Sequence, residues 1–276
     1  MRNVTGPPPL SPPRPAGWSE CDGVFVSPEP VGVDPEYPEH LRDWLATIEP
    51  KHFWFRSRAQ LIAATVRAQV GGEGWLELGC GNGYVLAEVG RRYRGPCFGQ
   101  ELSRHALTIA RTRTTAALYL CPPHDVPLRN LSGVGFFDVI EHLPDDVAGL
   151  RIARRYLKTG GVVLLTVPAH PWLWSQADEV SGHQRRYTRN SLVGVMESAG
   201  LRVEFCRPFF GSLLPELLLR RTIRLRDPNA ALRMFLQPPP MVVNEALRAI
   251  TQLEGRLCRL GLTPFGTSLL ALGRNT

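Results

Sequence analysis

The chain has only two lysines, Lys51 and Lys158, although its 32 basic residues outnumber its 25 acidic ones. Arginine supplies the rest of the positive charge, and the arginines are scattered along the chain instead of forming one basic run. A dense basic tract is the usual electrostatic footprint of a protein that binds nucleic acid. We therefore expect no nucleic-acid partner, despite the net charge of +7.

Cysteine pairs and long apolar runs are missing as well. The six cysteines include no C-x-x-C pair and no zinc-ligand spacing, which predicts reduced, buried thiols. No apolar run approaches the ~18 residues that a membrane-spanning helix requires, and prolines stand where the apolar part of a secretory signal would lie. These absences predict a cytoplasmic chain with no transmembrane segment, for which peripheral contact with a membrane remains open.

Residues 74–83 carry the strongest local signal, a short apolar run followed directly by glycines. The run Trp75–Leu78 predicts a buried parallel strand, and a helical segment follows from Tyr84. A strand, a glycine turn and a helix together present backbone N–H groups to a ligand. The spacing is E-x-G-x-G-x-G from Glu77, and it differs from the dinucleotide fingerprint because Tyr84 stands where the third glycine belongs. A Walker phosphate loop is excluded because no lysine lies near.

Three stretches together resemble a known family. The glycine turn and Glu101, the acid that ends the next apolar run, resemble motifs I and II of the class I S-adenosylmethionine (SAM) dependent methyltransferases. The run D-V-I-E-H-L-P-D-D, residues 138–146, is similar to a segment of the subgroup that includes the ubiquinone-pathway O-methyltransferases. Residues 168–187 resemble the P-x-H-x-W-L-W-S-x-x-D-E-x-x-G-H-x-R-R-Y signature of bacterial members. The resemblance extends from His52 to the C-terminus.

The resemblance implies a doubly wound α/β fold with a seven-stranded Rossmann-like sheet and an α-helical cap. We expect a flexible Pro-rich tail (1–33), an N-terminal helical lid (34–70), a SAM-binding α/β core (71–207), a helical cap insertion (208–264) and the final strand of the core sheet (265–276). A dimer interface and a membrane-surface helix are alternatives for the insertion. The expected oligomeric state is a monomer or a homodimer.

The cofactor implied by the resemblance is SAM, with S-adenosylhomocysteine as product. The glycines should approach its methionine and ribose part, and the Glu101 carboxylate should hold the ribose hydroxyls. The family's adenine-binding acid commonly stands where this chain has Pro123, and Asp125 is two residues nearer to Pro127, so an adenine role for Asp125 stays open. The expected cofactor-binding residues are Glu77, Gly79, Gly81, Gly83, Glu101, Leu102, Asp125 and Asp138.

The expected acceptor is a small, hydrophobic molecule from secondary metabolism or from glycan or lipid biosynthesis, with O-methylation favoured. The expected substrate-binding residues are Trp54, His170, Trp172, Trp174, Asp178, Arg185, Arg186 and Tyr187. Two structural alternatives are open. Asp178 could form an ion pair with Arg185 or Arg186 that pins the loop, and the helix of Trp54 could simply pack on the sheet edge.

Methyl transfer to a hydroxyl or a protonated amine requires a base, and the ordinary pKa of imidazole suits that role. We expect His142 or His183 to be the base, with His142 favoured because it follows the strand beside the methyl donor, and Glu141 to assist. Glu141 with His142, or Asp178 with His183, could instead hold a divalent cation, but the spacing does not predict one and we expect no metal. The rival functions are an RNA methyltransferase and a nucleoside-binding protein or cyclase of the same fold.

Overall fold

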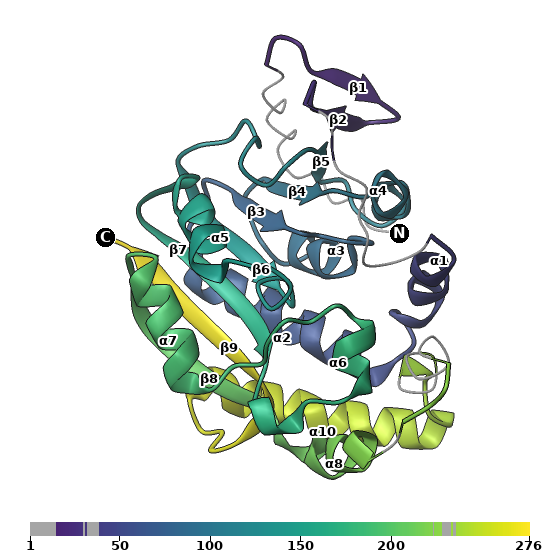
Figure 1. The fold of residues 1–276 in the computed structure, drawn as a ribbon. Helices are drawn as coiled ribbons and strands as arrows, with labels where there is room; N and C mark the ends of the chain where they lie inside the picture. Colours follow the sequence, from purple (N-terminus) through teal and green to yellow (C-terminus); the bar gives the residue numbers. More distant parts are fainter. Residues whose placement is uncertain (1–14, 30, 32–38, 223, 228–232, 234–235) are drawn as a thin grey trace.

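One mixed β-sheet runs through the molecule, and helices cover both of its faces (Figure 1). The computed structural model describes residues 15–29, 31, 39–222, 224–227, 233 and 236–276. The strands are β1 (Ser19–Cys21), β2 (Val24–Val26), β3 (Trp75–Leu78), β4 (Cys97–Glu101), β5 (Ala117–Leu120), β6 (Leu131–Phe137), β7 (Leu157–Pro168), β8 (Leu201–Phe210) and β9 (Gly266–Asn275). The α-helices are α1 (Glu39–Ile48), α2 (Phe53–Gln69), α3 (Tyr84–Gly90), α4 (Arg104–Arg111), α5 (Asp146–Arg154), α6 (Gln176–Val180), α7 (Arg189–Ser198), α8 (Leu214–Thr222) and α10 (Met241–Leu260).

The strand order is β1-β2-β5-β4-β3-β6-β7-β9-β8, with β9 antiparallel to both of its neighbours. From β3 the chain winds outward through β4 to β5 and then returns to the centre at β6, which pairs with the other side of β3. Ligand sites in open α/β sheets form at such a switch point, beyond the carboxyl ends of the parallel strands. The topology therefore brings the ends of β3, β4, β6 and β7 to one edge.

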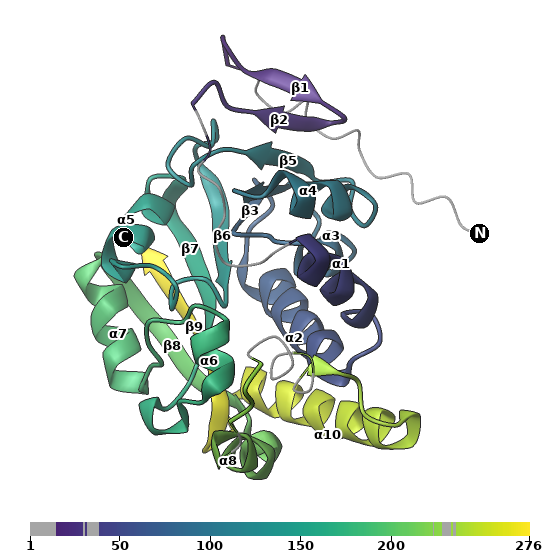
Figure 2. The ribbon, with the colours of Figure 1, turned by 45° about the vertical axis from the view of Figure 1, so that its right-hand side comes forward.

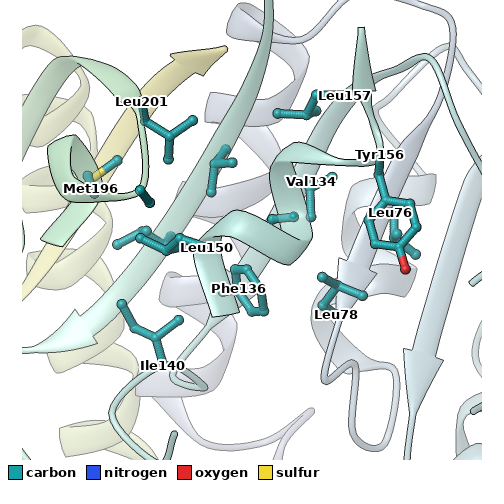
Figure 3. Packing of buried hydrophobic residues seen from close by; sticks show 14 of the residues in the cluster. Leu76, Leu78, Val134, Phe136, Ile140, Leu150, Tyr156, Leu157, Met196 and Leu201 are labelled. Atoms are coloured by element: carbon teal, nitrogen blue, oxygen red, sulfur yellow. The ribbon is translucent and has the colours of Figure 1, made fainter. Parts of the chain in front are cut away.

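The two faces of the sheet carry separate apolar cores, because successive side chains of a strand point to opposite faces. On one face Leu76 and Val134 belong to a cluster that also contains Leu150 of α5 and Met196 of α7 (Figure 3). On the other face Trp75 packs with α2 and α3. Gly135 on β6 makes room for this ring, since a Cβ there would lie 2.4 Å from a carbon of the Trp75 indole.

Several helix starts follow directly from the sequence. Ser103 caps α4, Asp145 caps α5 and Thr188 caps α7, each side chain accepting a hydrogen bond from a backbone N–H of the first turn. Such caps satisfy N–H groups that have no partner within the helix. Serine, threonine and aspartate are the residue types that favour this position, so these caps follow from the local sequence.

The sheet is wider than expected, because part of the segment taken for a flexible tail is folded. Residues 19–26 form the hairpin β1–β2, and β2 pairs in parallel with β5 at the edge of the sheet (Figure 2). Trp18 and Phe25 pack against the ring of Tyr119. Their ring centroids lie 5.9 and 5.4 Å, respectively, from the centroid of the Tyr119 ring. This apolar contact stabilises a segment whose proline content alone predicted disorder. Residues 1–14 of the expected tail lie outside the described part.

The expected lid and cap are both helical. Helices α1 and α2 precede the core, and α8 and α10 lie together at the end of the molecule away from the β1–β2 hairpin (Figures 1 and 2). Strand β8 continues to Phe210, so the helical insertion starts later than the expected residue 208. Within the described residues, the helices are too short or too polar to cross a bilayer.

Candidate active site

A cavity of about 820 Å³ opens at the carboxyl edge of the sheet. Its wall combines the ends of β3, β4 and β6 with α1, α2, the segment 175–186 and α8. Of the residues expected from the sequence, those that line it are Gly79, Gly81, Glu101, Leu102, Asp138, Glu141, His142, Trp54, Asp178, His183 and Arg186. Five segments distant in sequence thus share one site.

The glycine turn after β3 has the backbone geometry that its sequence implies. Gly79, Gly81 and Gly83 have φ angles of 71°, 51° and 72°, in the left-handed region that favours glycine. A Cβ on Gly81 would have no protein atom within 4 Å, and this residue lines the cavity, so its backbone faces open space. Gly83 does not line the cavity. It allows α3 to approach α4 closely, since a Cβ there would lie 2.7 Å from the Cβ of Ala110.

Glu101 lies at the end of β4 with its carboxylate against the glycine turn. Oε2 accepts a hydrogen bond from Gly81 N at 2.8 Å, while Oε1 accepts from Leu102 N at 2.7 Å and Ser103 N at 3.2 Å. Burial raises the pKa of the Glu101 carboxyl, against the opposing effects of the Arg42 charge and of these N–H groups. The side chain is therefore fixed in direction and borders the cavity beside Gly81.

Glu77, the first residue of the glycine motif, points into the protein instead of lining the cavity. Its Oε2 is buried and has no hydrogen-bond partner. Burial raises its pKa to about 8, with Arg58 opposing the shift and Glu101 adding to it. Glu77 is accordingly a buried, largely protonated acid behind the turn, not a residue that borders the ligand space.

Asp138 follows β6 and is held by a residue that the sequence analysis did not select. Its carboxylate forms an ion pair with Arg58 of α2 at 2.7 Å and accepts a hydrogen bond from Thr166 Oγ1 at 3.1 Å. Arg58 also lies over the indole of Trp54, 5.1 Å from the ring centroid. The position of Arg58 on the apolar, core-facing side of α2 was the available signal, because a buried guanidinium requires a partner.

Asp125 does not line the cavity, whereas Pro123 does. The Asp125 carboxylate lies 3.5 Å from Nε2 of His124, in the loop after β5. The structure therefore gives no support to an adenine contact by Asp125. Leu102 and Pro123 border the cavity there instead.

Two histidines that line the cavity have their rings close together and nearly perpendicular. His142 follows β6 and His183 follows α6, and their ring centroids are 4.8 Å apart at an interplanar angle of 81°. Two hydrogen bonds from Gln184 hold the two segments together. Its backbone N donates to Glu141 O, and its side-chain Nε2 donates to His142 O. Glu141 is buried, and the three residues Glu141, His142 and His183 each offer one ligand atom within 4.8 Å of the others.

Asp178 organises the loop that carries His183. Its Oδ1 contacts His183 Nδ1 at 2.9 Å, and Arg186 donates to both carboxylate oxygens at 2.7 and 3.0 Å. Burial opposes ionisation, but the hydrogen bond of His183 and the charge and hydrogen bonds of Arg186 outweigh it and lower the pKa of Asp178 to about 2. The ion pair that we considered for this loop is therefore present, with Arg186 as the partner.

Five expected substrate-binding residues lie outside the cavity: His170, Trp172, Trp174, Arg185 and Tyr187. Arg185 forms an ion pair with Asp146 at 3.1 Å, and the Tyr187 hydroxyl donates to the same carboxylate at 2.7 Å. His170 stacks on Phe265, with ring centroids 4.7 Å apart. Arg185 and Tyr187 therefore anchor the loop to α5, and neither Arg185 nor Arg186 offers an unoccupied clamp for an acidic substrate.

The N-terminal helices and the insertion both contribute residues to the cavity wall. From α2 and the residue before it come His52, Phe53 and Phe55, and from the insertion come Leu213, Leu217, Arg220 and Leu236. Burial and the nearby charge of Arg220 lower the pKa of His52 to about 4, so this imidazole is neutral at physiological pH. This part of the cavity wall is mainly apolar and aromatic.

Residues 51–204 match the sequence model of a protein family that is described as "Methyltransferase domain". The matched residues include the glycine turn, Glu101 and both histidines. The chain belongs to this family. A probable S-adenosylmethionine-dependent methyltransferase of Mycolicibacterium smegmatis is 30% identical over 183 residues, covering 60% of this chain and 66% of the relative. The match thus spans slightly less than two thirds of that relative.

Solved structures confirm the fold class of the chain. A putative methyltransferase in complex with the Haloferax volcanii Trm112 activator aligns over 85% of this chain and 97% of its own, with a TM-score of 0.53 and 19% identity. Phosphoethanolamine N-methyltransferase 2 of Haemonchus contortus, in complex with SAM, aligns over 90% of this chain and 62% of its own, with a TM-score of 0.57 and 17% identity. At this identity the likeness concerns the fold alone.

The cofactor of the methyltransferase domain is SAM, and the residues at the switch point fit it. Gly81 presents backbone without a Cβ to the cavity, and Glu101 places a carboxylate beside it. A carboxylate at the end of the second core strand is an acceptor suited to paired ribose hydroxyls. The largely apolar remainder of the cavity leaves room for an acceptor.

Proposed function

We propose that the whole chain transfers a methyl group from SAM to a small, hydrophobic acceptor, with oxygen as the favoured acceptor atom and His142 or His183 as the general base. One observation carries the proposal. The two imidazoles, 4.8 Å apart, line the same cavity as Gly81 and Glu101. A base and a cofactor site in one cavity are what methyl transfer to a hydroxyl requires.

The cofactor half of the cavity is assigned to the ends of β3 and β4. Gly79 and Gly81 would lie along the methionine and ribose part, Glu101 would accept the ribose hydroxyls, and Leu102 with Pro123 would border the adenine. Bound SAM supplies a methyl group on a cationic sulfonium, so the protein has to align and shield the reactants instead of activating the donor. Asp138, fixed by Arg58, borders the space between this half and the histidines.

The contact of His183 with Asp178 supports His183 as the base. If the hydrogen of His183 lies on Nδ1, toward Asp178, then Nε2 carries the lone pair that can take a proton from the acceptor hydroxyl. Ionised Asp178 would then stabilise the imidazolium that results. His142 is positioned as its neighbour and remains the alternative base, since it follows β6 beside the cofactor half.

The apolar wall supports a hydrophobic acceptor. Trp54 of α2, Leu143 of the segment after β6, and Leu213 and Leu217 of the insertion line the cavity. Apolar walls with a few placed polar groups are typical of small-molecule sites. The D-V-I-E-H-L-P-D-D run that contributes Glu141 and His142 supports a likeness to the ubiquinone-pathway O-methyltransferases, and this subgroup is part of the proposal.

The base assignment predicts a loss of turnover in two variants. His142→Ala and His183→Ala are compared with wild type by S-adenosylhomocysteine formation over a panel of phenolic and catechol acceptors. We expect the variant that lacks the base to lose ~100-fold or more in kcat, the usual scale of general base catalysis. His40→Ala, which changes an exposed histidine that does not line the cavity, should keep wild-type turnover. A loss below ~10-fold in both cavity variants would contradict the assignment.

The same assay separates the base from a metal centre. Glu141, His142 and His183 combine a carboxylate with imidazoles, a ligand set that suits a divalent cation. The proposed mechanism predicts that dialysis against EDTA leaves turnover unchanged. Loss of turnover that Mg²⁺ or Zn²⁺ restores would show instead that these residues hold a metal that acidifies the acceptor.

A further inference from the structure

Helix α10 packs on the molecule through an unusually polar side. Thr251 Oγ1 donates to Ser57 Oγ at 2.8 Å, and Asn244 Oδ1 accepts from Phe53 N at 2.9 Å, both on α2. The other buried positions of α10 include Gly255 and Cys258. Small and polar residues therefore form the contact with α2, where a surface helix normally buries its large apolar residues.

Most of the large apolar residues of α10 are exposed, whereas Leu247 packs against the core. At 100° per residue, Val242, Ala246, Ala249, Leu253 and Leu260 lie on the side opposite the contact with α2, and all of them are exposed. Val242 is 79% exposed, Leu253 56% and Leu260 70%. The helix is therefore amphipathic with its apolar stripe in solvent.

Helix α8, which is drawn at the same end of the molecule as α10 in both ribbon views, exposes apolar side chains as well (Figures 1 and 2). Leu218 and Leu219 of α8 are 41% and 64% exposed. Among the described residues, nine of the eleven exposed large hydrophobic side chains belong to the insertion. A concentration of this kind marks an interaction surface, because monomeric proteins rarely expose a large contiguous apolar patch.

The charge around this area is positive. The insertion, residues 208–264, contains eight arginines and four acidic residues, which gives it a net charge of +4 out of +7 for the chain. The acids of α10 are engaged within the protein, Glu245 by Arg56 and Arg248 and Glu254 by Ser212. Arg256 and Arg259 are exposed near the C-terminal end of the stripe.

We propose that this apolar and arginine-flanked surface of α8 and α10 docks on an anionic lipid bilayer. An amphipathic helix with basic residues lies in the interfacial plane of such a bilayer, with its apolar side in the acyl region. A second copy of this chain would bring the same arginines to the interface without acidic groups to match them, whereas anionic headgroups provide the complementary charge.

The position of α8 connects this surface to the cavity. Leu217 and Arg220 line the cavity, while Leu218 and Leu219 on the same helix are exposed. An acceptor dissolved in the bilayer would thus meet the cavity at the docked side of the molecule. This last step rests on the proposed function, whereas the docking surface itself is independent of the reaction.

Vesicle sedimentation of the purified chain, without SAM or acceptor, tests the docking surface apart from the proposed function. We expect the chain to bind vesicles of phosphatidylcholine mixed with phosphatidylglycerol and to bind pure phosphatidylcholine at least ~10-fold more weakly. The triple variant Val242→Ser, Leu253→Ser, Leu260→Ser should lose at least ~10-fold in partitioning. The double variant Arg256→Glu, Arg259→Glu should lose about 25-fold, at about fivefold for each arginine.

A control variant and a measurement of the oligomeric state complete the test of the docking surface. Arg91→Glu, Arg94→Glu makes the same charge change at exposed positions outside the insertion and should bind as wild type does. Matching circular dichroism and melting temperatures would show that all variants fold. Equal binding of wild type and both surface variants would overturn the proposal. The proposal would also be overturned if light scattering showed a dimer for the wild type and a monomer for the serine variant. The surface would then join two copies of the chain.

Discussion

Glu77 combines full burial with an oxygen that has no hydrogen-bond partner, and this sets how stability depends on pH. Its pKa is about 8 in the folded protein, against 4.5 for the ordinary carboxyl. Between these values the folded chain binds a proton that the unfolded chain lacks. The contribution of Glu77 to the free energy of unfolding is therefore largest below pH 4.5 and is lost as the pH rises toward 8.

Glu77→Gln removes this titration. We expect the free energy of unfolding of the variant, relative to wild type, to rise by up to ~1.4 kcal/mol per pH unit between about pH 4.5 and 8 in urea titrations. Glu73→Gln is the matched control with the opposite sign. A hydrogen bond from Lys158, then one from Ser132, lowers the pKa of Glu73 to about 2, so its contribution is lost only as the pH falls below 4.5. A pH-independent difference for Glu77→Gln would contradict its buried, protonated state.

The contacts of the polar residues in the segment 168–187 could not be predicted from residue type alone. The sequence placed Arg185, Arg186 and Tyr187 near the acceptor because the segment follows a parallel strand. Arg185 and Tyr187 instead contact Asp146, about 40 positions away in the chain. Composition indicates that such residues need polar partners, but it does not indicate whether a ligand or another loop provides them.

Elements with a strong local pattern were predictable, whereas the hairpin β1–β2 was not. The core strands and the caps Ser103 and Thr188 follow from short apolar runs and capping residues. The hairpin has only three residues in each strand and owes its place to the distant edge strand β5 and to Tyr119. A non-local contact of this kind leaves little signal in composition, which the prolines dominate.

The hairpin predicts a stability effect separate from the site. Trp18→Ala should lower the free energy of unfolding by about 3 kcal/mol, because it removes a buried indole that packs edge-on against Tyr119. Urea unfolding followed by circular dichroism measures the loss, and Trp18→Phe, which keeps an aromatic ring, should retain most of the stability. SAM affinity should not change, since the hairpin does not line the cavity. A change below ~0.5 kcal/mol would mean that the hairpin contributes little to the sheet in solution.

At the scale of the whole molecule, the sheet topology assembles the site and the helical additions give it walls. The glycine turn, Glu101, Asp138 and the two histidines come together because β3, β4, β6 and β7 end at one edge. This much was predictable, since parallel strands share their carboxyl edge. The partners Arg42 and Arg58 were not, because how α1 and α2 fold back over that edge depends on packing between segments distant in sequence.

The central claim, that this cavity binds SAM through Gly81 and Glu101, is tested most directly by calorimetric titration of the purified chain with SAM and with S-adenosylhomocysteine. We predict micromolar binding of both, weakened in Glu101→Ala by about 1.5–3 kcal/mol, the scale of hydrogen bonds to a charged group. Glu73→Ala, which removes an exposed carboxylate elsewhere, should leave the affinity unchanged. Absence of heat with either ligand on a folded sample, or equal affinity in Glu101→Ala, would contradict the account.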